Sequence, residues 1–168
     1  KNIKNKIVVN QFLRDSWNGF VKKTDSKKYK FDTTFNLKRL LALGNKLFSI
    51  PEGLSLFNKS KKIILNRNET LKEGKVDWGT AELLAYATLM NEGFNIRMSG
   101  QDVERGTFSH RHAILKMEDS EEEISPLQSI SKESKFEIYN SLLSEYGALG
   151  FDYGYSITLP NTLTIWEA

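Results

Sequence analysis

The spacing of apolar residues changes at residue 76, and this change constrains the fold more than any other feature of the chain. Beyond it, Asp77 can cap a helix that stops at Gly93, and residues 94–98 then alternate between apolar and polar side chains as a strand does. Residues 112–117 and 162–166 predict further strands. Residues 136–155 predict either a long helix or a strand, a loop and a helix. Helices and strands that alternate with short connections predict an α/β layered domain.

Residues 1–75 predict a mainly helical segment instead. Apolar residues recur at three- and four-residue steps over 8–21 and 34–48, with a polar linker at 25–32 between them. The second helix is expected to stop before Pro51, and a third to start within 52–57. The polar stretch 72–75 is the expected boundary with the α/β domain of residues 76–168, in which 117–123 predict an acidic turn and 126–130 a short extended piece.

Charge is divided unevenly between these two parts. Residues 1–75 carry 18 Lys and Arg against 6 Asp and Glu, whereas residues 76–168 carry 6 against 15. Clustered lysines raise the hypothesis of a basic nucleic-acid or scaffold-binding module. The lysines occur in scattered pairs without any nucleic-acid-binding motif, which favours a solvated helical surface or one that docks on an acidic neighbour.

Several classes of protein are disfavoured by composition. The chain has no cysteine, which excludes disulfides and thiolate metal sites. Its apolar runs are far shorter than the ~20 residues that span a bilayer, so no membrane segment is expected. Because it begins at Lys1 with no apolar signal segment, we expect it to be a piece of a longer protein.

Residues 99–112 (SGQDVERGTFSHRH) form the densest group of ionisable side chains, and they directly follow a predicted strand. Sites in α/β sheets lie in loops beyond the carboxyl ends of strands. Six ionisable residues fall in this run: Asp102, Glu104, Arg105, His110, Arg111 and His112. The two histidines would point to opposite faces of a strand, and their spacing fits no zinc motif, so no metal site is predicted. The alternative is a structural histidine beside a salt-bridged loop.

Residues 141–155 (SLLSEYGALGFDYGY) place Glu145 among apolar and glycine residues. A carboxyl group in an apolar pocket has a raised pKa and can hold a proton near neutral pH, which suits acid–base chemistry. Glu145 could equally point outward from an amphipathic helix, and the residues alone leave both readings open.

These two runs, with VDWGTAELLAYATLMNEG before them and TLTIWEA after, resemble the family of thiamine-diphosphate-dependent first components of 2-oxoglutarate dehydrogenase complexes. The resemblance is strong over 76–168 and weaker over 35–57. Relatives that act on 2-oxoadipate share much of the pattern, so the alternatives within this class are a relative that prefers 2-oxoadipate and one that simply decarboxylates 2-oxoacids. It implies the first part of a three-layer α/β, transketolase-like pyrimidine-binding domain, preceded by a mainly helical connector.

The resemblance also implies roles for individual residues. Glu145 occupies the position of the family's LSEYG glutamate, which hydrogen-bonds a pyrimidine nitrogen of thiamine diphosphate and so keeps the cofactor in its reactive imino tautomer. The loop residues are implied to contact cofactor (Gln101, Asp102) or, at the mouth of the site, substrate (Arg105, His110 and His112).

The implied reaction is oxidative decarboxylation of 2-oxoglutarate, with reductive succinylation of lipoyl groups on a partner succinyltransferase, by a homodimer. The family's glycine-aspartate-glycine segment, which holds the diphosphate and magnesium, does not occur in this sequence, so the metal ligands are expected outside it and this chain alone is expected to be inactive. The implied compartment is a bacterial cytoplasm or a mitochondrial matrix.

Overall fold

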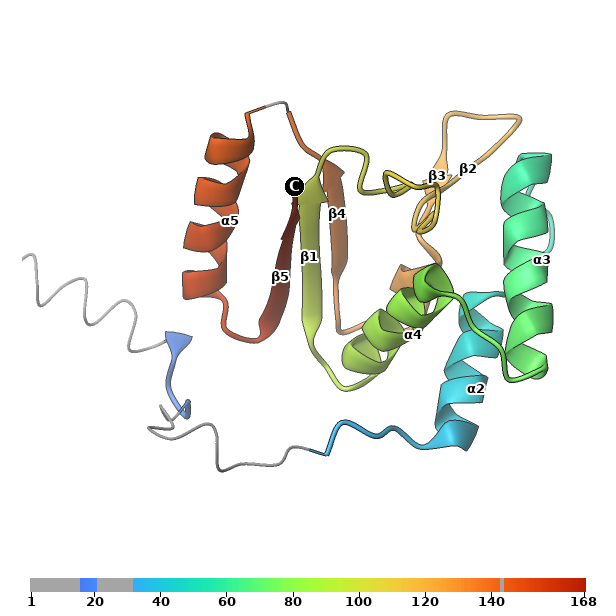
Figure 1. The fold of residues 1–168 in the computed structure, drawn as a ribbon, viewed down its shortest axis with the longest axis horizontal. Coiled ribbons are helices and arrows are strands. Elements are labelled where there is room, and N and C mark those ends of the chain that lie inside the picture. Colours follow the sequence, from blue (N-terminus) through green and yellow to red (C-terminus); the bar gives the residue numbers. More distant parts are fainter. Residues whose placement is uncertain (1–15, 21–31, 143) are drawn as a thin grey trace, which may run out of the picture.

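A computed structural model describes residues 16–20, 32–142 and 144–168 (Figure 1). Of the predicted helix over 8–21 only residues 16–20 are described, and of the predicted linker over 25–32 only residue 32, so most of both lies outside the described residues. The helices are α2 (Leu37–Leu47), α3 (Asn58–Lys72), α4 (Trp78–Asn91) and α5 (Glu145–Thr158), with a short 3₁₀ helix, η2 (Pro126–Ser129). The strands are β1 (Asn95–Gly100), β2 (Leu115–Lys116), β3 (Glu123–Ile124), β4 (Phe136–Asn140) and β5 (Thr162–Glu167). None of the helices in the described ranges is long and apolar enough to span a membrane.

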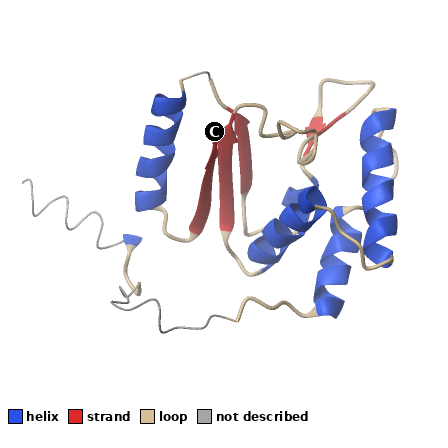
Figure 2. Ribbon diagram, in the orientation of Figure 1, coloured by secondary structure: helices blue, strands red, loops and turns tan. Residues whose placement is uncertain are grey.

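The central sheet has three strands in the order β4-β1-β5, and both pairings are parallel. Helices α4 and α5 flank the sheet on its two sides, so the layers are helix, sheet and helix (Figures 1 and 2). The predicted α/β class is confirmed. Because the strands are parallel, their carboxyl ends lie at one edge, and the loops that follow β1 and β4 leave the sheet there.

The two faces of the sheet differ in chemistry. Ile96 and Met98 are fully buried in the core that includes α4, whereas the alternate residues Arg97 and Ser99 hydrogen-bond to Asp152 of α5. The face toward α4 is therefore apolar and the face toward α5 polar.

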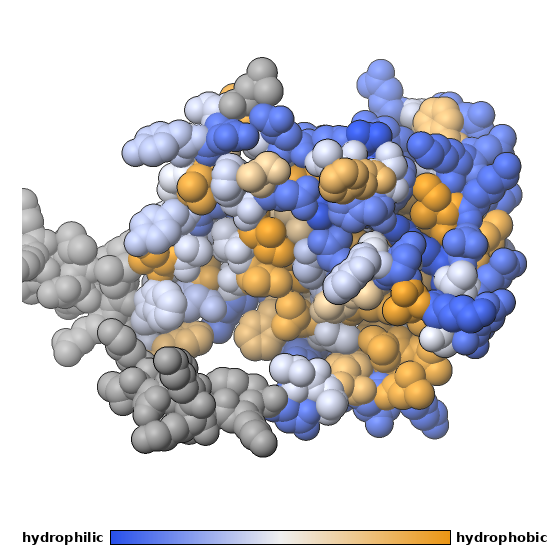
Figure 3. Space-filling model, in the orientation of Figure 1, coloured by the Kyte–Doolittle hydropathy of each residue, from blue (hydrophilic) through white to orange (hydrophobic). Residues whose placement is uncertain are grey.

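The apolar core continues into the helices that precede α4. Leu47 and Phe48 at the end of α2 and Ile64 and Leu71 of α3 are buried in the same cluster as the sheet residues. A Cβ at Gly44 would lie 2.3 Å from a methyl carbon of Leu71, so α2 and α3 approach closely. The lysines of α3 are exposed, and Figure 3 shows a hydrophilic surface on the side of the molecule that carries this helix.

Most of the predicted elements are present. The Asp77 carboxylate accepts a hydrogen bond from the Thr80 backbone N–H at 2.7 Å and so caps α4, and Gly93 adopts a φ of +92° just after it. Residues 136–155 form a strand, a loop and a helix, so the long single helix is wrong.

Three short predictions are also wrong. Only Leu115–Lys116 of the segment 112–117 is a strand, and His112 has a φ of +47°, outside the β region, so the strand cannot begin there. Residues 126–130 form a 3₁₀ turn rather than an extended piece, since Pro126 suits the first position of a helical turn. The third helix begins at Asn58, after the segment 52–57.

Candidate functional site at the carboxyl edge of the sheet

The candidate site lies at the edge where β1 and β4 end. The backbone N–H of Ser141 donates to the carbonyl of Gly100 at 2.7 Å, and that of Glu104 donates to the Asn140 side chain at 3.2 Å. Helix α5 begins at Glu145 beyond the same edge (Figure 1). Although widely separated in sequence, the loop that follows β1 (residues 101–114, the β1 loop) and Glu145 therefore lie at the same edge of the sheet.

The loop after β1 has an unusual and well-connected backbone. Three of its residues other than glycine have positive φ angles, a conformation that costs energy unless the surroundings impose it: Asp102, Ser109 and His112. The N–H groups of Arg111 and His112 both donate to the Arg105 carbonyl, at 2.9 and 3.0 Å. These bonds fold residues 105–112 back on themselves.

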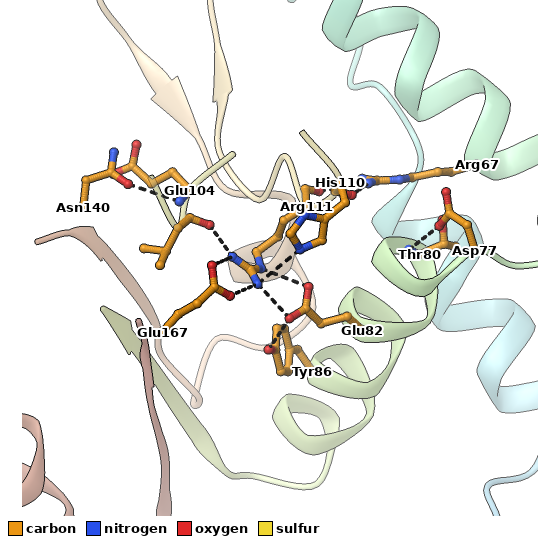
Figure 4. A network of polar contacts seen from close by, with 11 residues as sticks. Arg67, Asp77, Thr80, Glu82, Tyr86, Glu104, His110, Arg111, Asn140 and Glu167 are labelled. Carbon is orange, nitrogen blue, oxygen red and sulfur yellow. Dashed lines mark hydrogen bonds and ion pairs between the residues drawn. The ribbon is translucent and has the colours of Figure 1, made fainter. Parts of the chain in front are cut away.

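Arg111 is the centre of the polar network in Figure 4. Its guanidinium is buried and bonds both carboxylate oxygens of Glu82 on α4, at 2.9 and 3.0 Å, and the Glu167 carboxylate at the end of β5, at 2.5 Å. It also donates to the Val103 carbonyl at 2.7 Å, and Tyr86 donates its hydroxyl to Glu82 at 2.8 Å. One side chain thus connects the loop, α4 and the sheet.

This network also shifts the pKa values of its members. Burial opposes the charge of Arg111, but hydrogen bonds and charges from Glu82 and Glu167 outweigh it, so the pKa of Arg111 is raised. Burial, together with the adjacent charge of Glu82, raises the pKa of Tyr86. The network therefore holds a permanent cation between two carboxylates at neutral pH.

Arg67 of α3 supports the loop from the other side. Its guanidinium is buried and donates to the carbonyls of His110 and Arg111, at 2.6 and 2.9 Å (Figure 4). Burial lowers its pKa, although the nearby carboxylates of Asp77 and Glu82 oppose this. Arg67 thereby connects the helical segment to the loop.

Helix α4 approaches the same carbonyl so closely that only glycine fits. A Cβ at Gly79 would lie 2.1 Å from the backbone oxygen of His110.

Alanine normally stabilises a helix relative to glycine, by about 1 kcal/mol. We expect Gly79→Ala to destabilise the protein instead, by about 1–3 kcal/mol, because backbone must move. Gly150→Ala in α5, where nothing lies within 4 Å, is the control and should be neutral or stabilising. Urea unfolding of both variants tests this, and a Gly79→Ala variant more stable than the wild type would contradict the contact.

The two histidines lie in the loop and not on a strand, so the predicted placement on opposite faces of a strand is wrong. The ring of His110 packs against Gly106, where a Cβ would lie 2.5 Å from it, and Nδ1 of His110 is buried without a hydrogen-bond partner among the described residues. Burial, and then the charges of Arg67 and Lys59, lower the pKa of His112, which is therefore neutral at pH 7. Within residues 16–20, 32–142 and 144–168, no three His, Asp or Glu side chains are grouped to hold a metal ion.

Gln101, Asp102 and Arg105 lie at the solvent side of the loop. Gln101 is exposed, and Arg105 pairs with Asp102 and donates to the Ser109 hydroxyl at 2.8 Å. The hydrogen bond from Arg105 holds the pKa of Asp102 below its usual value. The alternative raised from the sequence, that Asp102 and Arg105 belong to a salt-bridged surface loop, therefore describes this part of the loop.

An open groove of about 460 Å³ runs between this loop and the start of α3. Its polar lining mixes cationic and anionic side chains and includes Lys59, Asp102, Glu104, Arg105, His112 and Asn140. A ligand that carries carboxylates could find both hydrogen-bond donors and positive charge there.

Glu145 is exposed at the first position of α5 and has no hydrogen-bond or ion-pair partner in the part of the chain that the structure describes. Of the two readings left open by the sequence, the described residues show the solvent-exposed one, because no apolar side chains enclose Glu145. Tyr146, Phe151 and Tyr153 of the same helix are also exposed. The apolar pocket expected around Glu145 is therefore not formed by the described residues, and its catalytic role stays a prediction.

Sequence reasoning did not single out Glu82, Glu167 or Arg67, which hold the loop in place. One signal was available for Glu82, because it is the only charged residue in α4, whose other residues are mostly apolar. A lone carboxylate in such a helix predicts a buried cationic partner. Arg67 and Glu167 carried no comparable signal.

The family model described as "Transketolase, pyrimidine binding domain" matches residues 74–168. The chain belongs to this family. The match begins just before the capping residue of α4 and includes every strand of the central sheet, the β1 loop and Glu145.

Individual members of the family extend this likeness toward the first residues of the chain. The mitochondrial 2-oxoglutarate dehydrogenase of Schizosaccharomyces pombe is 44% identical over 163 residues, which are 94% of this chain and 16% of the relative. The 2-oxoglutarate dehydrogenase E1 component of Coxiella burnetii is 51% identical over 140 residues, and that of Oceanobacillus iheyensis 48% over 141; these are 82% and 83% of this chain and 15% of each relative. The chain thus spans about one sixth of the length of the curated relatives it matches.

Proposed function

We propose that this chain is part of the first component of a 2-oxoglutarate dehydrogenase and forms one wall of its active site. The observation that carries the proposal is identity of 44–51% to enzymes of that name over 82–94% of this chain, together with a family match over residues 74–168 that includes both the β1 loop and Glu145. The placement of these two features at one sheet edge supports it. In this proposal residues 1–75 are a helical connector, and residues 76–168 begin the pyrimidine-binding domain.

The residues present fit a thiamine diphosphate site. Glu145 offers a carboxyl group that has no partner among the described residues, at the carboxyl ends of the strands, with no Cβ at Gly147 and Gly150 beside it on α5. Thiamine diphosphate supplies the electron sink for decarboxylation of a 2-oxoacid when it is bound. Glu145 would share a proton with a ring nitrogen of its pyrimidine, and Gln101 and Asp102 would contact the cofactor from the loop.

The groove beside the loop suits a substrate with two carboxylates. Arg105 and neutral His112 line it, whereas His110 lies in the same loop but not on the groove lining, with Nδ1 buried and without a partner among the described residues. Arg105 would pair with a carboxylate of 2-oxoglutarate, and the histidines would donate hydrogen bonds to it. In the proposal, magnesium and its ligands belong to other parts of the protein. The protein acts as a homodimer and transfers the succinyl group to the lipoyl group of a partner succinyltransferase. It resides in a mitochondrial matrix or a bacterial cytoplasm.

The test is an assay of the full-length protein with thiamine diphosphate and magnesium. We expect decarboxylation of 2-oxoglutarate in the presence of an artificial electron acceptor, and succinylation of a lipoylated domain of the succinyltransferase, whereas the 168-residue chain alone shows neither activity. A kcat/KM higher for 2-oxoadipate would reassign the substrate. No turnover of either oxoacid, together with salt-dependent binding to DNA or RNA, would favour the basic nucleic-acid-binding module instead.

A further inference from the structure

Helix α5 is attached to the sheet in an unusual way. Helix α4 buries seven residues, most of them apolar, whereas the only fully buried residue of α5 is a carboxylate, Asp152. Apolar packing is the usual means of fixing a helix on a sheet, and α5 has few buried apolar residues to provide it. Its polar contacts with the sheet therefore take a larger part in setting its position.

Asp152 makes these contacts with two alternate residues of β1. Its Oδ1 accepts a hydrogen bond from Nε of Arg97 at 2.8 Å, and its Oδ2 accepts one from the hydroxyl of Ser99. The Arg97 and Asp152 side chains retain 14% and 3% of their exposed surface, so the pair is shielded from water. A buried pair with fixed geometry is directional, since a shift of the helix breaks both bonds.

Aromatic rings hold the guanidinium in turn. The centre of the Arg97 guanidinium lies 4.9 Å from the ring of Tyr139 on β4, and 5.1 and 4.8 Å from the rings of Phe151 and Tyr155 on α5. Cation–π contacts of this kind restrict the rotamer of the arginine. Strand β4 and helix α5 therefore both contribute aromatic rings that hold the Arg97 guanidinium in place.

The spacing from Asp152 to Glu145 connects this pair to the candidate site. Seven residues are close to two helical turns, so both side chains lie on the same face of α5, about 10.5 Å apart along its axis. Three residues of a strand span about 10 Å. Because α5 runs antiparallel to β1 (Figure 1), a pairing of Asp152 with Arg97 and Ser99 places Glu145 just beyond the carboxyl end of β1, at the level where the loop begins with Gln101.

We propose that the Arg97–Asp152 ion pair, completed by Ser99, is a positioning device that sets the height and rotation of α5 and thereby holds Glu145 in register with the β1 loop. Asp152 and Arg97 are positioning residues and need not touch substrate or cofactor. The inference rests on the proposed function, because it acts through the role of Glu145 in that function.

The test uses the full-length protein and the variants Asp152→Asn and Arg97→Gln, alone and combined. A displacement of about 1 Å at a reacting group lowers the rate by about 100-fold. We expect each variant to lower kcat by about 10- to 100-fold with little change in KM, and to shift the acid limb of the pH profile of kcat. The double variant should be no worse than either single one, because one interaction is lost in all three.

Two measurements do not depend on turnover. Binding of thiamine diphosphate, followed by tryptophan fluorescence, should weaken, and hydrogen exchange of the amides at the start of α5 should accelerate. The control is Thr164→Val on β5, which lies opposite Arg97 on the same sheet face; the Thr164 hydroxyl has no hydrogen-bond partner among the described residues, so the change removes no contact of α5. It should leave kcat, the pH profile and cofactor binding unchanged.

If Arg97 and Asp152 had a purely structural role, the variants would lower the unfolding midpoint but leave kcat per cofactor-loaded site, and the acid limb of its pH profile, as in the wild type. That result would overturn the proposal. Additive losses of kcat in the double variant would also overturn it. If Asp152→Asn does not fold, Ser99→Ala removes one hydrogen bond and should give a smaller change of the same kind. If the wild type does not turn over an oxoacid, the proposed function is refuted. If the wild type is active, Glu145→Gln is inactive and Asp152→Asn is fully active, only this inference is refuted.

Discussion

Replacement of Glu145 by glutamine in the full-length protein is expected to lower kcat by about 10²- to 10⁴-fold, the range that a positioned proton-transfer group contributes. Glutamine keeps the size and hydrogen-bonding capacity of the side chain but has no carboxyl proton to share. Because Glu145 is exposed, the change removes no packing. It removes a negative charge from the first turn of α5, which costs only about 0.3–1 kcal/mol. The expected result is a catalytic defect in a folded protein.

The control for this prediction is Glu92→Gln. Glu92 is an exposed glutamate at the end of α4, next to the amino ends of the strands and thus at the opposite edge of the sheet from Glu145. The same chemical change there should leave kcat within twofold of the wild type. Steady-state kinetics with saturating thiamine diphosphate and the unfolding midpoint of each variant decide the matter. A Glu145→Gln enzyme with wild-type kcat would remove Glu145 from the proton chemistry.

The elements that sequence reasoning predicted well are those specified by their own residues. Helix α4 has a capping Asp77, a run of apolar side chains and a terminating Gly93 within one short segment, and the apolar residues of β1 alternate just after it. Once these elements are known to alternate, a parallel sheet follows, and with it the common edge at which the β1 loop and Glu145 lie.

The parts that escaped prediction depend on contacts between distant residues. Arg111 is separated by 29 positions from Glu82 and by 56 from Glu167. Together with Arg67, it holds a loop in which His112 takes a positive φ, so a segment whose composition predicts a strand contains only two strand residues. The attachment of α5 through Asp152 was equally inaccessible, since an acidic residue in an amphipathic helix is normally assigned to its solvated face.

The second large effect is expected at Arg111. Replacement of Arg111 by methionine retains an apolar stem of similar shape but deletes the charge that two carboxylates share. Loss of one partner of a buried ion pair costs about 3–5 kcal/mol, since the remaining charges lack compensation. Glu82 and Glu167 retain 24% and 29% of their side-chain exposure, so water relieves part of this penalty and the lower end, about 3 kcal/mol, is expected. Urea unfolding at pH 7 measures the change.

Arg105→Met is the matched control, because Arg105 lies in the same loop and also pairs with a carboxylate, that of Asp102, but in contact with solvent. The unfolding midpoint of Arg105→Met should remain that of the wild type.

If the carboxylates cause the loss of stability in Arg111→Met, then adding Glu82→Gln and Glu167→Gln to that variant should restore part of the stability, because neutral amides need no cation. The loop carbonyl of Val103 would still lack its donor, so recovery should be incomplete. An Arg111→Met protein as stable as Arg105→Met would show that the loop is held by Arg67 and by its own backbone hydrogen bonds.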